Sequence, residues 1–307
     1  MNPFQSLYTS CNSGTAAEKL ANLPDFPRMI DIELTNACNF RCKMCPTGNR
    51  KMTRPTGFME AGTFKKIIDQ CFLPGTAIRF IGWGEPTLHP QISGFVAEAS
   101  SSLLLTHLNT NGSTMTPDLA SRLVDAGLKS IKFSFQGTDE KTYAEMRDTD
   151  FYAGLIEAID MMNVARTKKE MFPGGFTVIK AAPYISASTT TTYESPEMIE
   201  EFRQEVGPLV DELNVGTTIF GYLGEKQDEG LSHPDPCPEV YTKVSIHWNG
   251  DVVVCCNSFD ASIVLGNVNE KSISEIWRHE SIEIYRENLA AGRYDNALCV
   301  DCWEYMA

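Results

Sequence analysis

The chain carries near its start the run Asn36-Ala37-Cys38-Asn39-Phe40-Arg41-Cys42-Lys43-Met44-Cys45. Its cysteines have the spacing C-x3-C-x2-C and offer three thiolates. A [4Fe–4S] cluster is usually held by four cysteine thiolates, so a loop with three leaves one iron free for a ligand that is not protein. The run therefore predicts an iron-sulfur cluster with one open coordination position.

A structural zinc site is the alternative for such a loop. Zinc motifs pair C-x2-C with a second pair of cysteines or with two histidines at a characteristic distance. Between Pro46 and Pro236 the one cysteine is Cys71, and the histidines of that region are scattered. The spacing therefore favours a cluster over zinc.

Composition sets the class of protein. The 307 residues, 42% of them apolar, are enough for one large domain and a small one. The chain has no apolar run long enough to span a membrane, and its start lacks the pattern of a signal peptide, so we expect a cytoplasmic protein with no membrane partner. In that compartment ten cysteines are ligands and reactive thiols rather than disulfides. The net charge of −14 argues against a nucleic-acid partner.

Between Arg28 and about Phe220, short apolar runs alternate with segments of helical periodicity, which is typical of βα units around a parallel sheet. The predicted strands are Met29–Leu34, Ala77–Gly82, Leu104–Thr110, Ser130–Gln136, Phe176–Tyr184 and Glu212–Gly216. The predicted helices are Glu60–Cys71, Pro90–Ser100, Pro117–Ala126, Phe151–Arg166 and Pro196–Val206. Six strands are fewer than a closed barrel needs. The predicted fold class is α/β, an open, partial (β/α)6 barrel.

The composition of the sequence changes after Gly224, where a polar stretch and two prolines follow. We therefore divide the chain into an N-terminal extension, 1–27, a barrel, 28–224, and a small C-terminal domain, 225–307. In the tail, Asn249-Gly250 predicts a type I′ hairpin between Lys243–Trp248 and Asp251–Cys255. Ser272 and Glu275 predict a helix with a capping box, and Thr189–Thr192 is interpreted as a solvated loop.

A second set of cysteines lies in this tail. It consists of Cys237, Cys255, Cys299 and Cys302, and Cys299-x2-Cys302 is a common chelate spacing. Four ligands would complete a cluster or a zinc site. We interpret Cys71 as a small buried hydrophobic residue and assign no role to Cys11. Cys256 adjoins a ligand but points to the other face if the strand continues, and is the candidate for a reactive thiol.

The cysteine loop is followed, one strand later, by Gly82-Trp83-Gly84-Glu85-Pro86. Together they resemble the signature of radical S-adenosylmethionine (radical SAM) enzymes, in which the amine and carboxylate of SAM chelate the open iron. Met44 stands where that family prefers an aromatic residue against the adenine, and a thioether can cover the same ring. The resemblance implies that Gly84 and Glu85 hold the SAM ammonium.

Polar residues at the ends of the third and fourth predicted strands complete the site that the resemblance implies. Asn111 and Ser134 would reach the ribose hydroxyls or the carboxylate of SAM. Arg147 is either a partner of a carboxylate or a solvated helix residue. The adenine-binding G-x-I-x-G pattern is absent from the predicted fifth strand.

The tail resembles the auxiliary-cluster region of SPASM and twitch domains. A full SPASM module needs about seven cysteines, and this tail has five. The resemblance thus implies a twitch form with one auxiliary [4Fe–4S] cluster, two clusters in all. The motifs that carry it are Trp248–Cys255, Leu265–Val268, Ile276-Trp277 and Cys299-x2-Cys302.

The resemblance implies that the first cluster, reduced by a donor such as flavodoxin or ferredoxin, cleaves SAM to a 5′-deoxyadenosyl radical that takes a hydrogen from the substrate. The layout is similar to those of the butirosin-pathway aminocyclitol dehydrogenase and neomycin C epimerase, which implies a small carbohydrate-like substrate. We expect an epimerase in which Cys256 returns the hydrogen. The alternatives are a dehydrogenase with the auxiliary cluster as electron acceptor, a peptide-modifying enzyme, and a non-catalytic iron-sulfur electron carrier.

Overall fold

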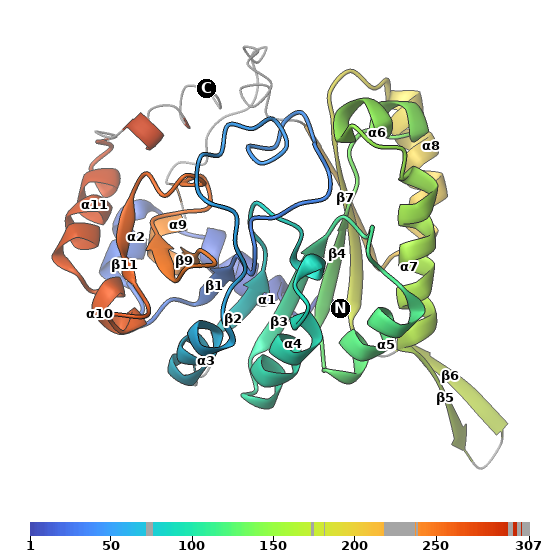
Figure 1. Ribbon diagram of the computed structural model, residues 1–307, viewed down its shortest axis with the longest axis horizontal. Helices are drawn as coiled ribbons and strands as arrows, with labels where there is room; N and C mark the ends of the chain where they lie inside the picture. Colours follow the sequence, from blue (N-terminus) through green and yellow to red (C-terminus); the bar gives the residue numbers. More distant parts are fainter. Residues whose placement is uncertain are drawn as a thin grey trace.

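The protein is built around one sheet of nine strands in the order β11-β10-β9-β1-β2-β3-β4-β7-β8 (Figure 1). The computed structural model describes residues 1–71, 76–172, 175–180, 182–217, 237, 239–293, 297–299 and 302. The barrel strands are β1 (Met29–Ile32), β2 (Ala77–Phe80), β3 (Leu105–Thr110), β4 (Ser130–Ser134), β7 (Tyr184–Thr191) and β8 (Glu212–Thr217), and neighbours among them pair in parallel. This confirms the predicted open, six-stranded β/α barrel.

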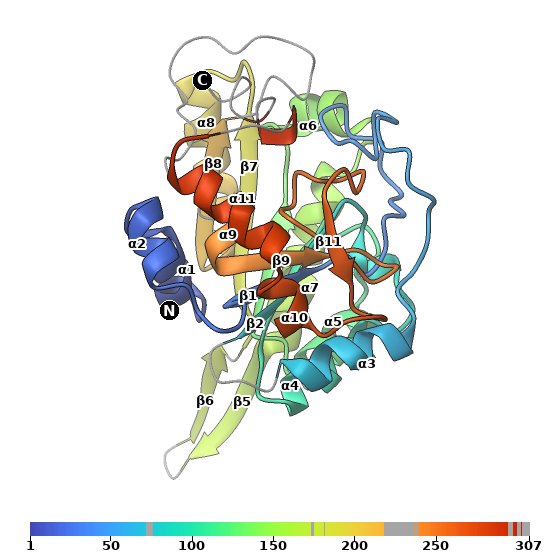
Figure 2. The same cartoon turned by 90° about the vertical axis from the view of Figure 1, so that its left-hand side faces the viewer.

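The fifth barrel strand differs from the prediction. The apolar run from Phe176 forms β6 (Gly175–Lys180), which pairs with β5 (Thr167–Phe172) as a hairpin that projects from the body of the protein (Figures 1 and 2). The barrel strand is instead β7, whose Ser- and Thr-rich end had been interpreted as a loop. Thr189 is buried, and its hydroxyl donates to the carbonyl oxygen of Gly137. Polar residues fit in this strand because the buried hydroxyls of Ser186 and Thr189 donate to backbone carbonyl oxygens.

The five predicted helices are present and pack on the outer face of the sheet. They are α3 (Ala61–Gln70), α4 (Ile92–Ser101), α5 (Pro117–Asp125), α7 (Tyr152–Arg166) and α8 (Pro196–Val206), with the short 3₁₀ turns η1 (Pro86–Leu88) and η2 (Gly207–Leu209). A further helix, α6 (Glu140–Arg147), begins at a capping box of Asp139 and Thr142. It brings Arg147 to the top of β4.

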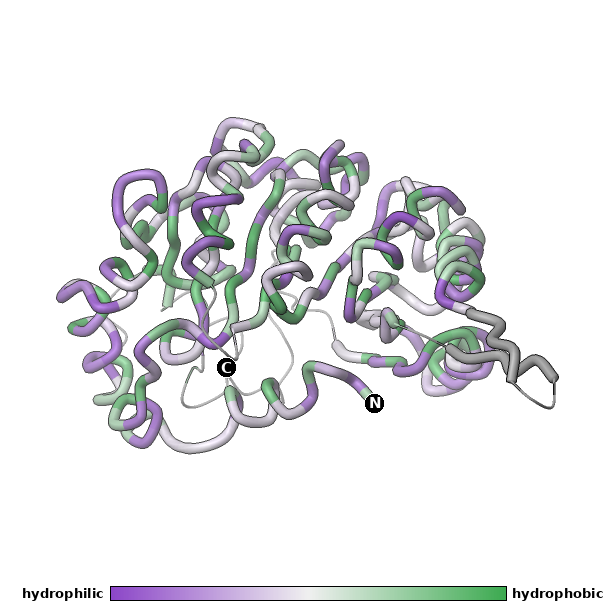
Figure 3. Tube along the Cα trace, turned by 90° about the horizontal axis from the view of Figure 1, so that it is seen from below, coloured by the Kyte–Doolittle hydropathy of each residue, from purple (hydrophilic) through white to green (hydrophobic). Residues whose placement is uncertain are grey.

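Hydrophobic and hydrophilic residues are interspersed along the chain trace in Figure 3. Successive side chains of a strand point to opposite faces of the sheet. On β1, Ile30 and Ile32 are fully buried in the core under the helices. Asp31 and Glu33 alternate with them and point into the barrel. The charged residues of an otherwise apolar strand thus line the interior.

The C-terminal segment extends the barrel sheet. Its strand β9 pairs in parallel with β1, and β10 and β11 follow as antiparallel neighbours. The elements are α9 (Glu239–Thr242), β9 (Lys243–Ile246), β10 (Asp251–Val253), β11 (Val264–Asn267), α10 (Ile273–Trp277) and α11 (Glu280–Ala290). The Ser272–Glu275 capping box is confirmed. The boundary that we placed between 224 and 225 lies outside the described residues.

The predicted type I′ turn is wrong. The Gly250 amide donates to the His247 carbonyl oxygen, and Gly250 has a φ of +90°, whereas Asn249 is not among the residues with positive φ. The loop therefore has three residues, Trp248 to Gly250, with the left-handed glycine of a bulge.

The N-terminal extension closes the lower end of the barrel. It contains α1 (Gln5–Asn12) and α2 (Ala16–Ala21). Phe4 is fully buried against Met29 and Ala77, at the starts of β1 and β2, and its ring meets His107 edge-on. In the described part of the chain, we find no helix that is both long and apolar enough to cross a membrane.

Candidate active site

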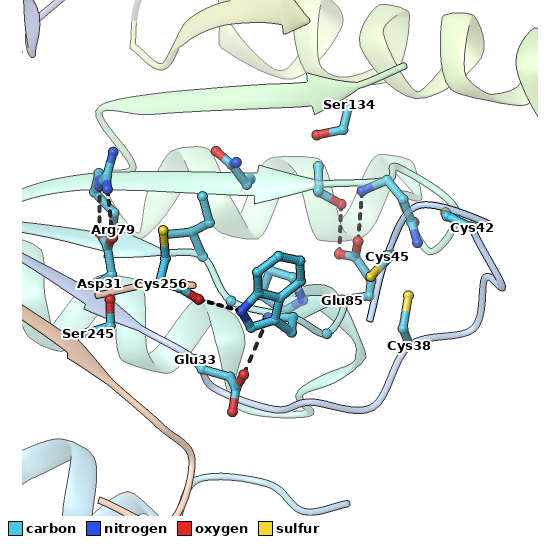
Figure 4. Close-up of a pocket in the computed structure, with 18 of the residues that line it drawn as sticks. Asp31, Glu33, Cys38, Cys42, Cys45, Arg79, Glu85, Ser134, Ser245 and Cys256 are labelled. Atoms are coloured by element: carbon cyan, nitrogen blue, oxygen red, sulfur yellow. Dashed lines mark hydrogen bonds and ion pairs between the residues drawn. The ribbon is translucent and has the colours of Figure 1, made fainter. Parts of the chain in front are cut away.

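A cavity of about 470 Å³ lies at the C-terminal ends of the barrel strands, where β/α barrels build their sites. Its lining includes the residues predicted for the first cluster, for SAM and for the reactive thiol, namely Cys38, Cys42, Met44, Cys45, Gly84, Glu85, Asn111, Ser134 and Cys256. Figure 4 shows the three loop cysteines at one end of the cavity and Asp31, Arg79 and Ser245 at the other. Cys256 lies towards the second end.

The cysteine loop presents its three thiols to this cavity. Two backbone hydrogen bonds hold the loop. The Cys45 amide donates to the Cys42 carbonyl oxygen at 3.1 Å, and the Lys43 amide donates to the Met146 carbonyl oxygen at 2.9 Å. Burial raises the pKa of Cys38 to about 11 and also raises that of Cys42. The Cys38 and Cys42 thiols are therefore protonated in the metal-free protein, and binding of iron would release those protons.

The donor set fits a cluster with one open position. Among the residues that the structure describes, no three His, Cys, Asp or Glu side chains converge closely enough to hold a single metal ion. A cluster needs no such convergence, because each cysteine binds a different iron. Three thiols on one cavity wall are the arrangement that the sequence predicted.

Glu85 lies fully inside the protein with both carboxylate oxygens bonded. Oε1 accepts from the Thr87 amide at 3.0 Å, the Thr87 hydroxyl at 2.5 Å and the Thr110 hydroxyl at 2.8 Å. Oε2 accepts from the Asn111 amide at 2.7 Å and has a second lone pair. Burial raises the pKa of Glu85, against the lowering effect of these bonds. The carboxylate is thus rigidly placed, with Oε2 able to accept one further donor.

Gly84 allows the backbone before Glu85 to touch the cysteine loop. A Cβ atom on Gly84 would lie 2.6 Å from the Ala37 carbonyl oxygen and closer still to that of Thr35. The Glu85 amide donates to the same Ala37 oxygen at 2.8 Å. The glycine therefore fixes the Gly-Glu segment against the cysteine loop.

Asn111 and Ser134 line the cavity in different ways. The side-chain amide of Asn111 donates one N–H to Asn39 at 3.1 Å and accepts from the Ser113 hydroxyl at 2.6 Å, which leaves its second N–H for a ligand. It ties β3 to the cysteine loop. Ser134 contributes its side chain at the end of β4, and its carbonyl oxygen accepts from Arg147.

Arg147 is buried, so of its two interpretations the solvated helix residue is wrong. The partners that the structure gives it are a thiol and a carbonyl oxygen rather than a carboxylate. Its guanidinium also lies 3.5 Å from the Cys42 sulfur, and its Nε is buried without a partner. An arginine at a cluster thiolate would stabilise negative charge there. The sequence signal for this role was weak, because α6 was not predicted.

The loop that carries Cys256 closes over the cavity. The Trp83 indole donates to the Cys256 carbonyl oxygen at 2.7 Å, and Asp260 accepts from the Thr53 amide at 2.7 Å and the Thr53 hydroxyl at 2.6 Å. The Cys256 thiol is exposed within the cavity and lies 4.0 Å from Glu239. The protein around it, and then Glu239, raise its pKa to about 12, so the group is a thiol rather than a thiolate.

The tail cysteines form a separate group. Cys255 packs with Val254 and Leu289, away from the cavity that Cys256 lines. The strand β10 ends at Val253, so this separation arises from the loop rather than from strand alternation. The pKa of Cys237 is raised to about 12, chiefly by burial, with smaller contributions from negative charge on Glu239, Cys299 and Cys302. The four predicted auxiliary ligands, Cys237, Cys255, Cys299 and Cys302, are thus near enough to influence one another's ionisation.

The polar end of the cavity was not predicted. Asp31 forms a two-point ion pair with Arg79 at 2.6 and 2.7 Å, and Lys243 approaches it at 3.9 Å. Burial raises the pKa of Asp31, but Arg79 and Lys243 outweigh it and lower the value overall. Charged residues between the apolar positions of β1 were the signal that could have identified this end.

Comparison with known proteins gives matches to two families. Residues 32–180 match the radical SAM superfamily, and residues 237–303 match the SPASM iron-sulfur cluster-binding domain. The tungsten-containing aldehyde ferredoxin oxidoreductase cofactor-modifying protein of Pyrococcus furiosus is 24% identical over 90% of this chain and 87% of its own. Mycofactocin maturase MftC of Mycobacterium tuberculosis is 28% identical over 92% of this chain and 77% of its own.

Two solved structures are similar in fold. BtrN in complex with AdoMet and 2-DOIA has a TM-score of 0.56 at 18% identity, over 86% of this chain and 87% of its own. Streptococcus suis SuiB bound to precursor peptide SuiA has a TM-score of 0.69 at 18% identity, over 100% of this chain and 76% of its own. These likenesses concern the fold.

Proposed function

We propose, for a chain that belongs to the radical SAM superfamily and carries a SPASM domain, that the protein abstracts hydrogen from a carbohydrate-like carbon and inverts that carbon. The two domains imply a [4Fe–4S] cluster, auxiliary cluster binding and SAM. We also propose that the chain consists of a barrel, 28–224, and a twitch-like tail, 225–307, and that the tail binds one auxiliary cluster. An external reductant such as flavodoxin or ferredoxin would reduce the first cluster.

We assign residues to each group from the lining of the cavity and from the separate group of tail cysteines. Cys38, Cys42 and Cys45 would hold the first cluster, and Cys237, Cys255, Cys299 and Cys302 the auxiliary one. Gly84, Glu85, Asn111, Ser134 and Met44 would hold SAM, with the free lone pair of Glu85 Oε2 meeting its ammonium. When bound, the reduced cluster and SAM supply a 5′-deoxyadenosyl radical.

One observation carries the choice of epimerisation. Cys256 lies in the same cavity as the cysteine loop, as a protonated and accessible thiol towards the opposite end. A substrate between the two ends would meet the radical source on one side and the thiol on the other. Cys256 would then deliver a hydrogen atom to the face opposite the one attacked and become a thiyl radical. One electron from the external reductant and one proton would restore the thiol.

Two other outcomes rest on the same cavity. The fold likeness to BtrN favours a dehydrogenase, in which the auxiliary cluster would accept the second electron. The relatives that include a mycofactocin maturase and a PqqA peptide cyclase favour a peptide substrate.

The test is turnover of the reconstituted enzyme with a panel of aminocyclitols, aminoglycosides and short peptides, read as substrate-dependent 5′-deoxyadenosine and product mass. We expect a carbohydrate product of unchanged mass. A ketone lighter by two hydrogens would establish the dehydrogenase, and stimulation by peptides alone would remove the carbohydrate proposal.

A further inference from the structure

We infer that Ser245 and His247 form the subsite that binds the hydroxyl groups of the substrate. This inference rests on the proposed carbohydrate-like substrate and names the residues that recognise it. Both side chains come from the C-terminal segment, one on β9 and one directly after it, and both line the cavity.

Both residues have buried polar atoms without a partner. Ser245 is 7% exposed and His247 is 3% exposed, yet Ser245 Oγ and His247 Nδ1 have no hydrogen-bond partner. A buried polar atom left unpaired costs about 1–3 kcal/mol, so a pair of them on one wall of a cavity is best explained by a ligand. They are two residues apart, which places them on one face of the strand.

The subsite sits beside the thiol end of the cavity. Asp31 on β1 has two register partners, Ser245 on the neighbouring strand β9 and Arg79 on the neighbouring strand β2. Figure 4 shows Ser245 close to this ion pair, on the side of the cavity where Cys256 lies. A ligand bonded to Ser245 and His247 would therefore be held within reach of Cys256 and away from the cysteine loop.

The charges of this end indicate the chemical class of the contacted groups. The cations that the structure describes at this end of the cavity are already paired, Arg79 with Asp31 at 2.6 Å and Lys243 with Glu239 at 2.7 Å. Arg147 also lines the cavity but lies at the other end, 3.5 Å from the Cys42 sulfur. A phosphate or carboxylate needs an uncommitted cation. Burial lowers the pKa of His247, so its ring is neutral and has one donor and one acceptor nitrogen. A serine hydroxyl and a neutral imidazole match uncharged hydroxyl groups.

The experiment measures binding of neamine, an aminocyclitol glycoside, to the anaerobically reconstituted, SAM-loaded protein by calorimetry. Ser245→Ala and His247→Phe should each weaken neamine binding about three- to tenfold, as expected for one lost hydrogen bond. SAM affinity and iron content should not change. Without neamine, Ser245→Ala should melt no lower than the wild type, because it removes an unpaired polar atom.

Ser93→Ala is the matched control, since Ser93 Oγ is also buried and unpartnered but lies on α4, outside the cavity lining. It should bind neamine like the wild type. Equal neamine affinity in the wild type and both cavity variants would overturn the subsite. A wild type that binds no neamine would instead refute the carbohydrate proposal, and the subsite with it.

Discussion

Replacing Glu85 by Gln tests the proposed SAM site at one atom. The amide would keep its oxygen at the Oε1 position, where three donors from Thr87 and Thr110 converge. Its NH₂ group would then face the Asn111 amide, which now donates to Oε2 at 2.7 Å. One buried donor loses its acceptor, which costs about 1–3 kcal/mol of folding stability.

The larger effect should fall on SAM. A charge-assisted hydrogen bond between the SAM ammonium and Oε2 is worth about 1.5–3 kcal/mol, so its loss should weaken SAM binding roughly 10- to 150-fold. Equilibrium dialysis of reconstituted protein with labelled SAM measures this. Glu283→Gln, an exposed glutamate on α11, is the control and should leave the affinity unchanged.

The same bond gives a pH dependence. Burial raises the pKa of Glu85, so its charge is lost at a higher pH than for an exposed glutamate. Wild-type SAM affinity should therefore fall as the pH drops through that raised pKa, whereas the affinity of the Gln variant should stay flat. Wild-type affinity for SAM in a Gln variant with both clusters loaded would refute the role of Glu85.

Three further changes probe the cavity walls. Changing Cys38, Cys42 and Cys45 together to Ala should remove about half of roughly eight irons and abolish 5′-deoxyadenosine formation; iron-free protein with stoichiometric zinc would contradict the two-cluster account. Gly84→Ala should lower both the melting temperature and SAM affinity, because its Cβ would collide with the Ala37 carbonyl; calorimetry showing wild-type stability would exclude that contact. Asp260→Ala should release the segment around Thr53, because it removes hydrogen bonds of 2.6 and 2.7 Å, and proteolysis of that segment should become faster. An unchanged cleavage pattern would show that the contact between Asp260 and Thr53 does not hold the segment in place.

The sequence predicted the parts of the site that depend on short spacing. The cysteine loop and the Gly84-Glu85 segment are each compact in sequence, and both follow barrel strands, so strand order alone brings them together. Cys256 was expected near the cavity from its neighbour Cys255. The two cysteines do lie on different sides, but strand alternation is not the reason, because β10 ends at Val253.

Contacts between distant segments were not predictable in the same way. Ser245 meets Asp31 because β9 pairs with β1, and no local pattern records a pairing across so long a separation. The predicted fifth strand is wrong because the apolar run from Phe176 belongs to the hairpin strand β6, which precedes the polar strand β7. The sequence left Arg147 open between a partner of a carboxylate and a solvated residue, because its burial depends on the distant cysteine loop that it contacts.

The most direct test of the account is turnover in D₂O, with the deuterium content of the product measured by mass spectrometry. Thiol hydrogens exchange with solvent, so inversion by Cys256 should place one deuterium at the inverted carbon. The Cys256→Ala variant should still form 5′-deoxyadenosine but no epimer. An oxidised product without solvent deuterium, formed at full rate by Cys256→Ala, would contradict the account and establish the dehydrogenase in its place.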